Sequence, residues 1–198
     1  MVNIYESPEY WCGEVGYRPP GYSDFIINLM KELYVIANYP ESVLDIGCAY
    51  GFSVCRLRLL RINAFGIDIS NYALSKAYER VKPFLKQGDV CELPYKDKEF
   101  DFILCTGVLE HLTEEQLNRA IPEILRVSHR GVIGVSCKDD PTTHEDDDKT
   151  HCVILTRKEW QEMFPPQYKV ISDSTASWMK NTYSLITSKL IGRGINFV

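Results

Sequence analysis

Three of the four histidines in this chain lie in two short stretches that also contain acids, and these residue types could do chemistry. The first stretch reads GVLEHL and holds Glu110 and His111. The second reads THEDDDKTH and holds His144 and His151 around a run of four consecutive acids. An imidazole titrates near neutral pH and also binds metals, and carboxylates take part in both kinds of chemistry. These residues are therefore consistent with two interpretations, a proton-accepting site and a divalent-metal site.

The elements that must position these residues alternate along the chain. Short apolar runs take turns with helical patterns, which predicts right-handed crossovers and a parallel sheet with helices on both faces. The predicted strands are 42–47, 63–69, 84–90, 100–106 and 131–137. The predicted helices between them are 52–60, 71–81 and 113–128, the last opened by a capping box of Thr113 and Gln116.

The two ends of the chain have other patterns. Apolar residues at three-to-four spacing predict a helix from Asp24 to about Asn38. Near the other end, a helix at 156–164 precedes the strand-like runs YKVISDSTASW and NTYSLITSKL, which we expect to pair antiparallel at one edge of the sheet. Residues 1–22 are rich in Tyr, Pro and Gly and lack periodicity, so we expect an arm or lid ahead of one domain at 23–198.

Composition indicates a soluble, single-domain protein of the cytoplasm. The 198 residues, 45% of them hydrophobic, suffice for one domain with a substantial core. There is no run of 18 apolar residues, and acids near the N-terminus stand where a signal peptide needs a basic flank. The seven cysteines include no CxxC pair, which favours buried reduced thiols over a zinc site or a redox pair.

The net charge of -5 has a local origin. Six of the 27 acids lie between positions 139 and 148, which leaves 21 acids against 22 bases elsewhere. A face that binds nucleic acid needs clustered Lys and Arg, and the best cluster, CRLRLLR at 55–61, has the spacing of one helix. The charge pattern therefore disfavours a nucleic acid partner. We expect no membrane partner either, and the sequence indicates no oligomeric state.

A glycine turn leaves the first predicted strand in the sequence VLDIGCAYGFS. Such a turn between a strand and a helix aims free backbone N–H groups at a ligand above it. Acids recur at the predicted strand ends: Asp45, then Asp68, 21 residues after Gly47, and Asp89, 21 residues further on. A carboxylate at the end of the second strand can accept both hydroxyls of a ribose, so this spacing predicts a nucleotide-like cofactor.

Together these motifs resemble the class I S-adenosylmethionine-dependent methyltransferases. VLDIGCAYG resembles the first motif of that family, GIDIS the second, GDV the third, and FDFILCTGVLEHL the fourth with the sequence that follows. The resemblance spans roughly residues 23 to 190. It implies a Rossmann-like, doubly wound α/β fold of seven strands, mostly parallel with a reversed last strand. It also implies an enzyme that transfers methyl groups, with S-adenosylmethionine as cofactor.

Carried over by position, the resemblance assigns cofactor-binding residues. The glycine turn would pass the methionine part, Asp68 would hold the ribose, and Asp89 would meet the adenine amino group beside Val90. The full set is Asp45, Gly47, Ala49, Gly51, Asp68, Ile69, Asp89, Val90 and Thr106. Ala49 departs from the family's GxGxG pattern. The turn also lacks the G-x-G-x-x-G that a nicotinamide cofactor requires, which disfavours a dehydrogenase.

Methyl transfer requires an aligned acceptor and a group that takes or accommodates its proton. TGVLEHL follows the fourth strand, so Glu110 and His111 are expected near the transferred methyl group. The fifth strand leads into THEDDDKTH, and HCVILTRKEW resembles a segment that points a histidine at the acceptor in small-molecule and sugar methyltransferases. His111, His151 and Glu110 are therefore the predicted catalytic residues, with packing roles as the alternative.

The preferred function is O-methylation of a small molecule or of the end of a sugar or glycan. An acidic loop and an aromatic arm would enclose a compact acceptor better than a large one. The arm residues that suit this task are Tyr5, Trp11, Tyr17 and Tyr22.

Two alternatives remain open. One is a metal-assisted RNA 2'-O-methyltransferase, which uses an E-x-x-E-H motif and a later histidine. Its ligands here would be Glu110, His111, His144 and His151. Gly107 replaces the first Glu of that motif, and we expect no metal, because losing a carboxylate weakens a hard-metal site. The other alternative is a protein of this fold that binds without turnover.

Overall fold

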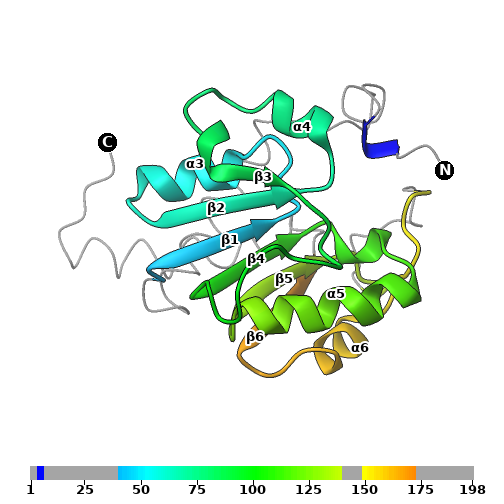
Figure 1. The fold of residues 1–198 in the computed structure, drawn as a ribbon. Helices are drawn as coiled ribbons and strands as arrows, with labels where there is room; N and C mark the ends of the chain where they lie inside the picture. The colour runs from blue at the N-terminus through cyan, green and yellow to red at the C-terminus, as the bar shows by residue number, and fades with distance from the viewer. Residues whose placement is uncertain (1–3, 7–39, 140–148, 173–198) are drawn as a thin grey trace, which may run out of the picture.

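The computed structural model describes residues 4–6, 40–139 and 149–172, and these residues are built around a parallel sheet (Figure 1). The strand order is β3-β2-β1-β4-β5-β6, and every neighbouring pair runs parallel. The strands are β1 (Ser42–Ile46), β2 (Asn63–Asp68), β3 (Leu85–Gln87), β4 (Phe102–Thr106), β5 (Gly131–Val135) and β6 (Tyr168–Ser172). The strand order reverses between β1 and β4, which is where open α/β sheets bind ligands at their carboxyl ends.

Helices and single turns connect these strands. The α-helices are α3 (Phe52–Leu59), α4 (Asn71–Ser75), α5 (Glu114–Val127) and α6 (Arg157–Glu162), and the 3-10 turns are η1 (Ile4–Glu6), η2 (Lys82–Phe84) and η3 (Leu109–His111). The predicted capping box of α5 is confirmed, since Thr113 and Gln116 exchange side-chain to backbone hydrogen bonds of 2.9 and 3.3 Å. No helix in these described ranges is long and apolar enough to cross a membrane.

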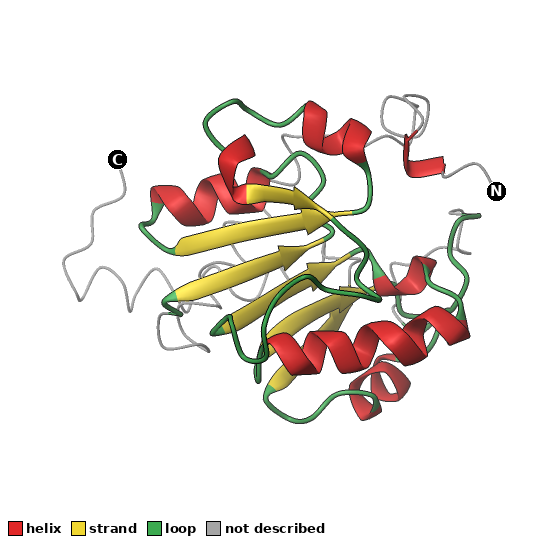
Figure 2. Cartoon of the chain, in the orientation of Figure 1, coloured by secondary structure: helices red, strands yellow, loops and turns green. Residues whose placement is uncertain are grey.

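Helices cover both faces of the sheet, as the sequence predicts (Figure 2). On one face, Ile124 of α5 and Trp160 of α6 are buried in the same cluster as Leu44 of β1. On the other face, Leu57 of α3 is buried with Val43 of β1. Successive residues of a strand point to opposite faces, so β1 supplies apolar residues to both layers.

Two predicted elements are shorter than the sequence suggests. The run at 84–90 forms a strand only over Leu85–Gln87, because its partner strand β2 ends at Asp68, whose carbonyl accepts the last bond between the two strands from the N–H of Gly88 at 2.9 Å. The helix predicted at 71–81 ends at Ser75, whose hydroxyl donates to the carbonyl of Tyr72 at 2.6 Å. A serine side chain that bonds the backbone in this way competes with the continuing helix.

The edge of the sheet beyond β5 agrees with the prediction only in part. The first half of YKVISDSTASW forms β6, and this strand pairs with β5 in parallel. The run NTYSLITSKL and the helix predicted from Asp24 to about Asn38 lie outside the described residues. The described sheet has six strands, so the seventh strand and its reversed direction stay predictions.

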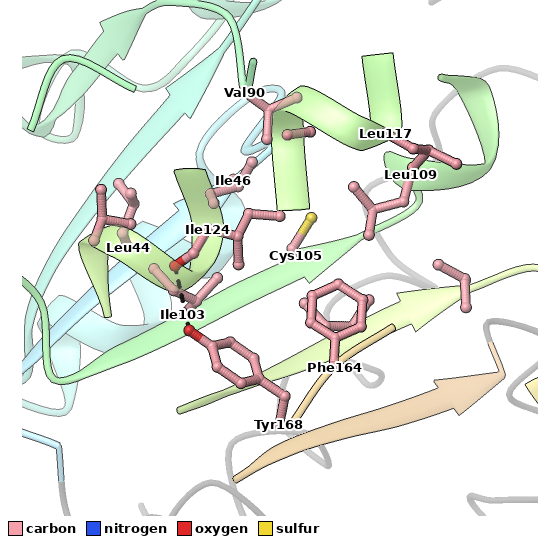
Figure 3. Packing of buried hydrophobic residues seen from close by; sticks show 14 of the residues in the cluster. Leu44, Ile46, Val90, Ile103, Cys105, Leu109, Leu117, Ile124, Phe164 and Tyr168 are labelled. Carbon is pink, nitrogen blue, oxygen red and sulfur yellow. Dashed lines mark hydrogen bonds between the residues drawn. The ribbon is translucent and has the colours of Figure 1, made fainter. Parts of the chain in front are cut away.

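The largest apolar cluster lies between α5 and the sheet, and Tyr168 of β6 joins it by a polar contact (Figure 3). Tyr168 is 1% exposed, and its hydroxyl lies 3.2 Å from the carbonyl of Ile124 and 3.1 Å from that of Ser128. The last carbonyls of a helix lack partners within the helix. The Tyr168 hydroxyl therefore satisfies the buried end of α5 and fixes it on β6.

Replacing Tyr168 by Phe tests this contact. The variant keeps the ring but leaves buried carbonyls without their donor, so we expect the free energy of unfolding to fall by about 1 to 2 kcal/mol. Urea unfolding followed by circular dichroism measures the change. Tyr78→Phe is the matched control, since Tyr78 is 56% exposed and its loss should change stability by less than about 0.5 kcal/mol. Equal stability of Tyr168→Phe and the wild type would contradict the assignment.

Candidate functional site

The turn between β1 and α3 stands at the carboxyl edge of the sheet. Gly47 and Gly51 both have left-handed backbones, with φ of 75° and 71°, and a Cβ on Gly47 would overlap the side chain of Val108. The N–H of Gly47 donates to the carbonyl of Ile67 at 2.8 Å, which fastens the turn to β2. Ala49 also has a positive φ, 47°, so this position keeps a conformation that glycine adopts at lower cost.

Asp68 ends β2 and joins two turns. Its Oδ2 accepts from the N–H of Ala49 at 2.7 Å, and its Oδ1 accepts from the N–H of Ser70 at 2.8 Å. Asp68 is 7% exposed; burial raises the pKa of its carboxyl, and the two N–H donors oppose that rise. A carboxylate offers about four acceptor positions. The two backbone bonds therefore leave capacity for the hydroxyls of a ribose.

Asp45 is buried beside the glycine turn, with 1% of its surface exposed. Burial raises the pKa of Asp45 to about 8, the hydroxyl of Ser53 opposes this rise, and the charge of Asp68 adds to it. Asp45 Oδ2 and Ser53 Oγ make no hydrogen bond within the described residues, although Ser53 lies near enough to affect the pKa. A buried carboxyl with unused acceptor capacity suits a cationic group of a ligand.

The residues after β2 and β3 lie next to each other at the same edge. Ile69 follows Asp68 and is 43% exposed, and its carbonyl accepts from the side chain of Gln87 at 3.2 Å. Asp89 stands two residues beyond β3, and its Oδ1 accepts from the N–H of Cys91 at 2.8 Å. Val90 is buried. An exposed isoleucine at the edge of the sheet is an apolar surface that a flat ring of a ligand can cover.

His111 and His151 meet, although 39 residues of sequence separate them. Their ring centroids lie 4.7 Å apart, and the rings meet edge to face at 68°. Thr150 Oγ1 lies 2.9 Å from Nδ1 of His111, and the ring of Tyr5 lies edge-on to His111 with centroids 6.0 Å apart. His111 ends η3, the 3-10 turn that follows β4. The structure thus brings both predicted histidines into one cluster beyond the carboxyl end of β4.

Hydrogen bonds of Glu110 connect the segments that carry this cluster. Glu110 is 1% exposed, and its Oε1 accepts from the N–H of Ser136 at 3.0 Å. Its backbone carbonyl accepts from the N–H groups of Cys152 at 2.7 Å and Val153 at 3.1 Å. These bonds tie η3 to the end of β5 and to the segment that carries His151. A direct catalytic role for Glu110 stays a prediction.

Of the four candidate metal ligands, Glu110, His111 and His151 lie within the described ranges and His144 lies outside them. Within those ranges, no three His, Cys, Asp or Glu side chains converge as a metal site. His144 and the acids at 145–148 lie outside them.

Thr106, which is predicted to bind the cofactor, lies at the end of β4 and is 7% exposed.

Sequence reasoning did not single out Ser53, Ser70 or Thr150. A serine ahead of a helical run is a common N-cap, and Ser70 Oγ accepts from the N–H of Ala73 at 3.0 Å, so this signal was present. Thr150 precedes His151 directly, but its contact with His111 depends on the fold. No pattern in the sequence predicts that contact.

Comparison with known proteins agrees with this geometry. Residues 44–135 match a family model described as "Methyltransferase domain". The match runs from β1 to the end of β5 and contains the glycine turn, Asp68, Asp89 and His111. These residues form a class I methyltransferase domain. Its cofactor is S-adenosylmethionine.

Individual proteins resemble this methyltransferase domain over part of their length. Nodulation protein S of Azorhizobium caulinodans is 34% identical over 105 residues, which are 51% of this chain and 50% of that protein. Ajmaline N-methyltransferase of Rauvolfia serpentina is 27% identical over 127 residues, 56% of this chain and 43% of that protein. This chain thus spans half or less of the length of these relatives.

One solved structure shows the likeness in fold. The methyltransferase domain of a bacterial Hen1 protein (CtHen1-C) superposes with a TM-score of 0.55 at 20% identity. The superposition covers 71% of this chain and 80% of that domain. It agrees with the Rossmann-like arrangement that the resemblance implies.

The residues at the edge of this methyltransferase domain fit S-adenosylmethionine. Asp45 has a buried oxygen without a hydrogen bond in the described residues and would face the ammonium of the methionine part, and Asp68 has acceptor positions left that would take the ribose hydroxyls. Ile69 has an exposed apolar surface that would face the adenine, and Asp89, two residues beyond β3, would accept from the adenine amino group. These are the positions that the sequence resemblance assigns to the cofactor.

The pKa of Asp45 predicts a pH-dependent stability for the ligand-free protein. Because the folded-state pKa is raised to about 8 from an ordinary value of 3.8, the folded state binds a proton that the unfolded state has lost. This stabilisation is complete at low pH and is lost as pH rises through 8. Between pH 6 and pH 9 the wild type should lose about 2 to 3 kcal/mol more than Asp45→Asn, which cannot titrate.

Urea unfolding of both proteins at pH 6 and pH 9 measures this difference. Groups that do not interact with Asp45 titrate alike in the two proteins and cancel in the comparison. The same loss of stability in both proteins would contradict the raised pKa.

Proposed function

We propose that the protein transfers a methyl group from S-adenosylmethionine to a hydroxyl of a small molecule or of the end of a sugar or glycan. One observation carries the proposal: the contact of His111 with His151, 4.7 Å between ring centroids, at the same edge as the glycine turn and Asp68. The cofactor supplies a methyl group activated by its sulfonium. The residues of the chain then have to align the acceptor and take its proton.

In this proposal one imidazole takes the proton and its neighbours orient it. When Nδ1–H of His111 donates to Thr150 Oγ1, Nε2 carries the lone pair that can accept the proton of the hydroxyl. His151 packs edge to face on His111 and completes the pair. Tyr5 offers an aromatic face to a flat or sugar-like acceptor.

The choice of oxygen over nitrogen rests on the two imidazoles. A hydroxyl gains from a base during transfer, whereas a neutral amine attacks without one. Ajmaline N-methyltransferase is named for transfer to nitrogen, so amines are the competing class of acceptor. The proposal includes a compact acceptor as the only substrate partner, no nucleic acid, and the cytoplasm as the location.

Two other functions have less support from the described residues. A metal-assisted RNA 2'-O-methyltransferase would place its first glutamate at Gly107, which here has a φ of 64° and no side chain. Its later histidine would be His144, which lies outside the described residues, or His151, and no three His, Cys, Asp or Glu side chains among the described residues converge as a metal site. A binding protein of this fold would keep the cofactor edge and have no turnover.

Isothermal titration with S-adenosylmethionine tests the cofactor part of the proposal. The wild type should bind, and Asp68→Ala should bind at least about tenfold more weakly, since hydrogen bonds to a charged group are lost. Asp97→Ala is the matched control, because Asp97 is 78% exposed and pairs with Arg126. No binding by the wild type at high micromolar cofactor would contradict the proposed function.

Transfer of a labelled methyl group to a panel of sugars, phenols, amines and short RNAs tests the acceptor part. We expect transfer to hydroxyls that resists EDTA, and a fall in kcat of about 10²-fold or more for His111→Ala or His151→Ala when that residue is the base. His129→Ala, at an exposed histidine, should behave as the wild type. Activity confined to amines or RNA, or abolished by EDTA, would contradict the proposal.

A further inference from the structure

The turn η1 lies far from the rest of the described chain in sequence but docks on the carboxyl edge of the sheet. The Glu6 carboxylate accepts from the N–H of Asn71 at 2.6 Å and from that of Tyr72 at 3.0 Å. Ser70 Oγ donates to the carbonyl of Tyr5. Figure 1 shows η1, in blue, next to α4 and beyond the carboxyl ends of the strands. These three hydrogen bonds join η1 to the residues that follow β2.

Ser70 connects η1 with the carboxylate that is assigned to the ribose. It is fully buried, and its N–H donates to Asp68 Oδ1 at 2.8 Å. Its Oγ accepts from the N–H of Ala73 and donates to Tyr5. One residue thus fixes the orientation of Asp68, the start of α4 and the position of η1. A displacement of η1 changes the surroundings of Asp68 through Ser70, and it also moves the charge of Glu6, which raises the pKa of Asp68.

The other contact of η1 lies across the sheet. The ring of Tyr5 meets His111, which follows β4, whereas Glu6 binds the residues that follow β2. The strand order is β2-β1-β4, so η1 spans the carboxyl end of β1. The glycine turn that is assigned to the cofactor stands at that end. The segment therefore lies across the cofactor-binding edge, with one contact on each side.

We propose that Glu6 and Ser70 are positioning residues that clamp Ile4–Glu6 across the bound cofactor and hold Tyr5 against His111. The proposal rests on the proposed function, since it takes the edge beside Asp68 as the cofactor site. The clamp links two events at separate strand ends. Release of the cofactor requires Glu6 to leave α4, and that movement withdraws Tyr5 from the histidine pair. The acceptor site is therefore complete only while the clamp is docked.

Substitutions can remove the contacts at the two ends of the clamp one at a time. Glu6→Ala removes both bonds to α4 and leaves Ser70 and Asp68 in place. Glu6→Gln keeps an acceptor oxygen and should restore much of the wild-type behaviour. Tyr5→Ala removes only the ring, because its backbone carbonyl still accepts from Ser70. Glu79→Ala is the control, since the exposed Glu79 pairs with Lys82 on the surface.

Stopped-flow dissociation of S-adenosylhomocysteine measures the cofactor end of the clamp. We expect Glu6→Ala to release the probe about tenfold faster than the wild type, the factor that 1.4 kcal/mol represents. Glu6→Gln, Tyr5→Ala and Glu79→Ala should release it within about twofold of the wild-type rate. Equal rates for Glu6→Ala and the wild type would overturn the clamp.

Carbethoxylation of histidines, followed by peptide mass spectrometry on the ligand-free protein, measures the other end. Glu6→Ala and Tyr5→Ala should both speed the modification of His111 by about tenfold, while Glu79→Ala leaves it unchanged. Unchanged reactivity of His111 in both variants would overturn the contact between the clamp and the histidine pair. Failure of the wild type to bind S-adenosylhomocysteine would overturn the proposed function instead, and this second measurement would still decide whether η1 covers His111.

Discussion

The carboxylate of Asp68 is the constraint on which the geometry of the site depends. It accepts from the N–H of Ala49 in the turn after β1 and from the N–H of Ser70 in the turn after β2, at 2.7 and 2.8 Å. The two turns therefore cannot move apart without breaking a buried, charge-assisted hydrogen bond. Because Asp68 is buried, its charge is costly unless such donors surround it. The carboxylate that is assigned to the ribose is thus also the tie between the first two strand ends.

A second tie lies at the other side of the sheet, where Glu110 connects η3, the end of β5 and the segment that carries His151. The carboxylate fixes the end of β5 and the backbone carbonyl fixes residues 152–153. The turns that are assigned to the methyl donor and the histidine pair lie at different strand ends, so the distance between them is set by the sheet itself. Loops that are anchored to a rigid sheet by buried hydrogen bonds keep reacting groups in place at low entropic cost at the moment of reaction.

The sequence predicted most of the described sheet, because buried parallel strands read as short apolar runs between glycine turns. It overestimated two elements for local reasons: β3 ends where its partner strand β2 ends, at Asp68, and Ser75 bonds its own helix backbone. It singled out Asp68 and both histidines by type and spacing, and their roles stay predictions. The sequence did not predict the contact between His111 and His151, because that contact depends on the Glu110 carbonyl accepting from the N–H groups of residues 152–153. The docking of η1 on α4 was equally hidden, because one glutamate among 27 acids gives no signal.

A crystal structure of the complex with S-adenosylhomocysteine tests the central claim most directly, because it shows the donor and the histidine pair in one frame. The account predicts ribose hydroxyls within about 3.2 Å of the Asp68 carboxylate and the sulfur on the side of the edge where His111 and His151 lie. A complex in which the ribose avoids Asp68, or in which the sulfur faces away from both histidines, would contradict it.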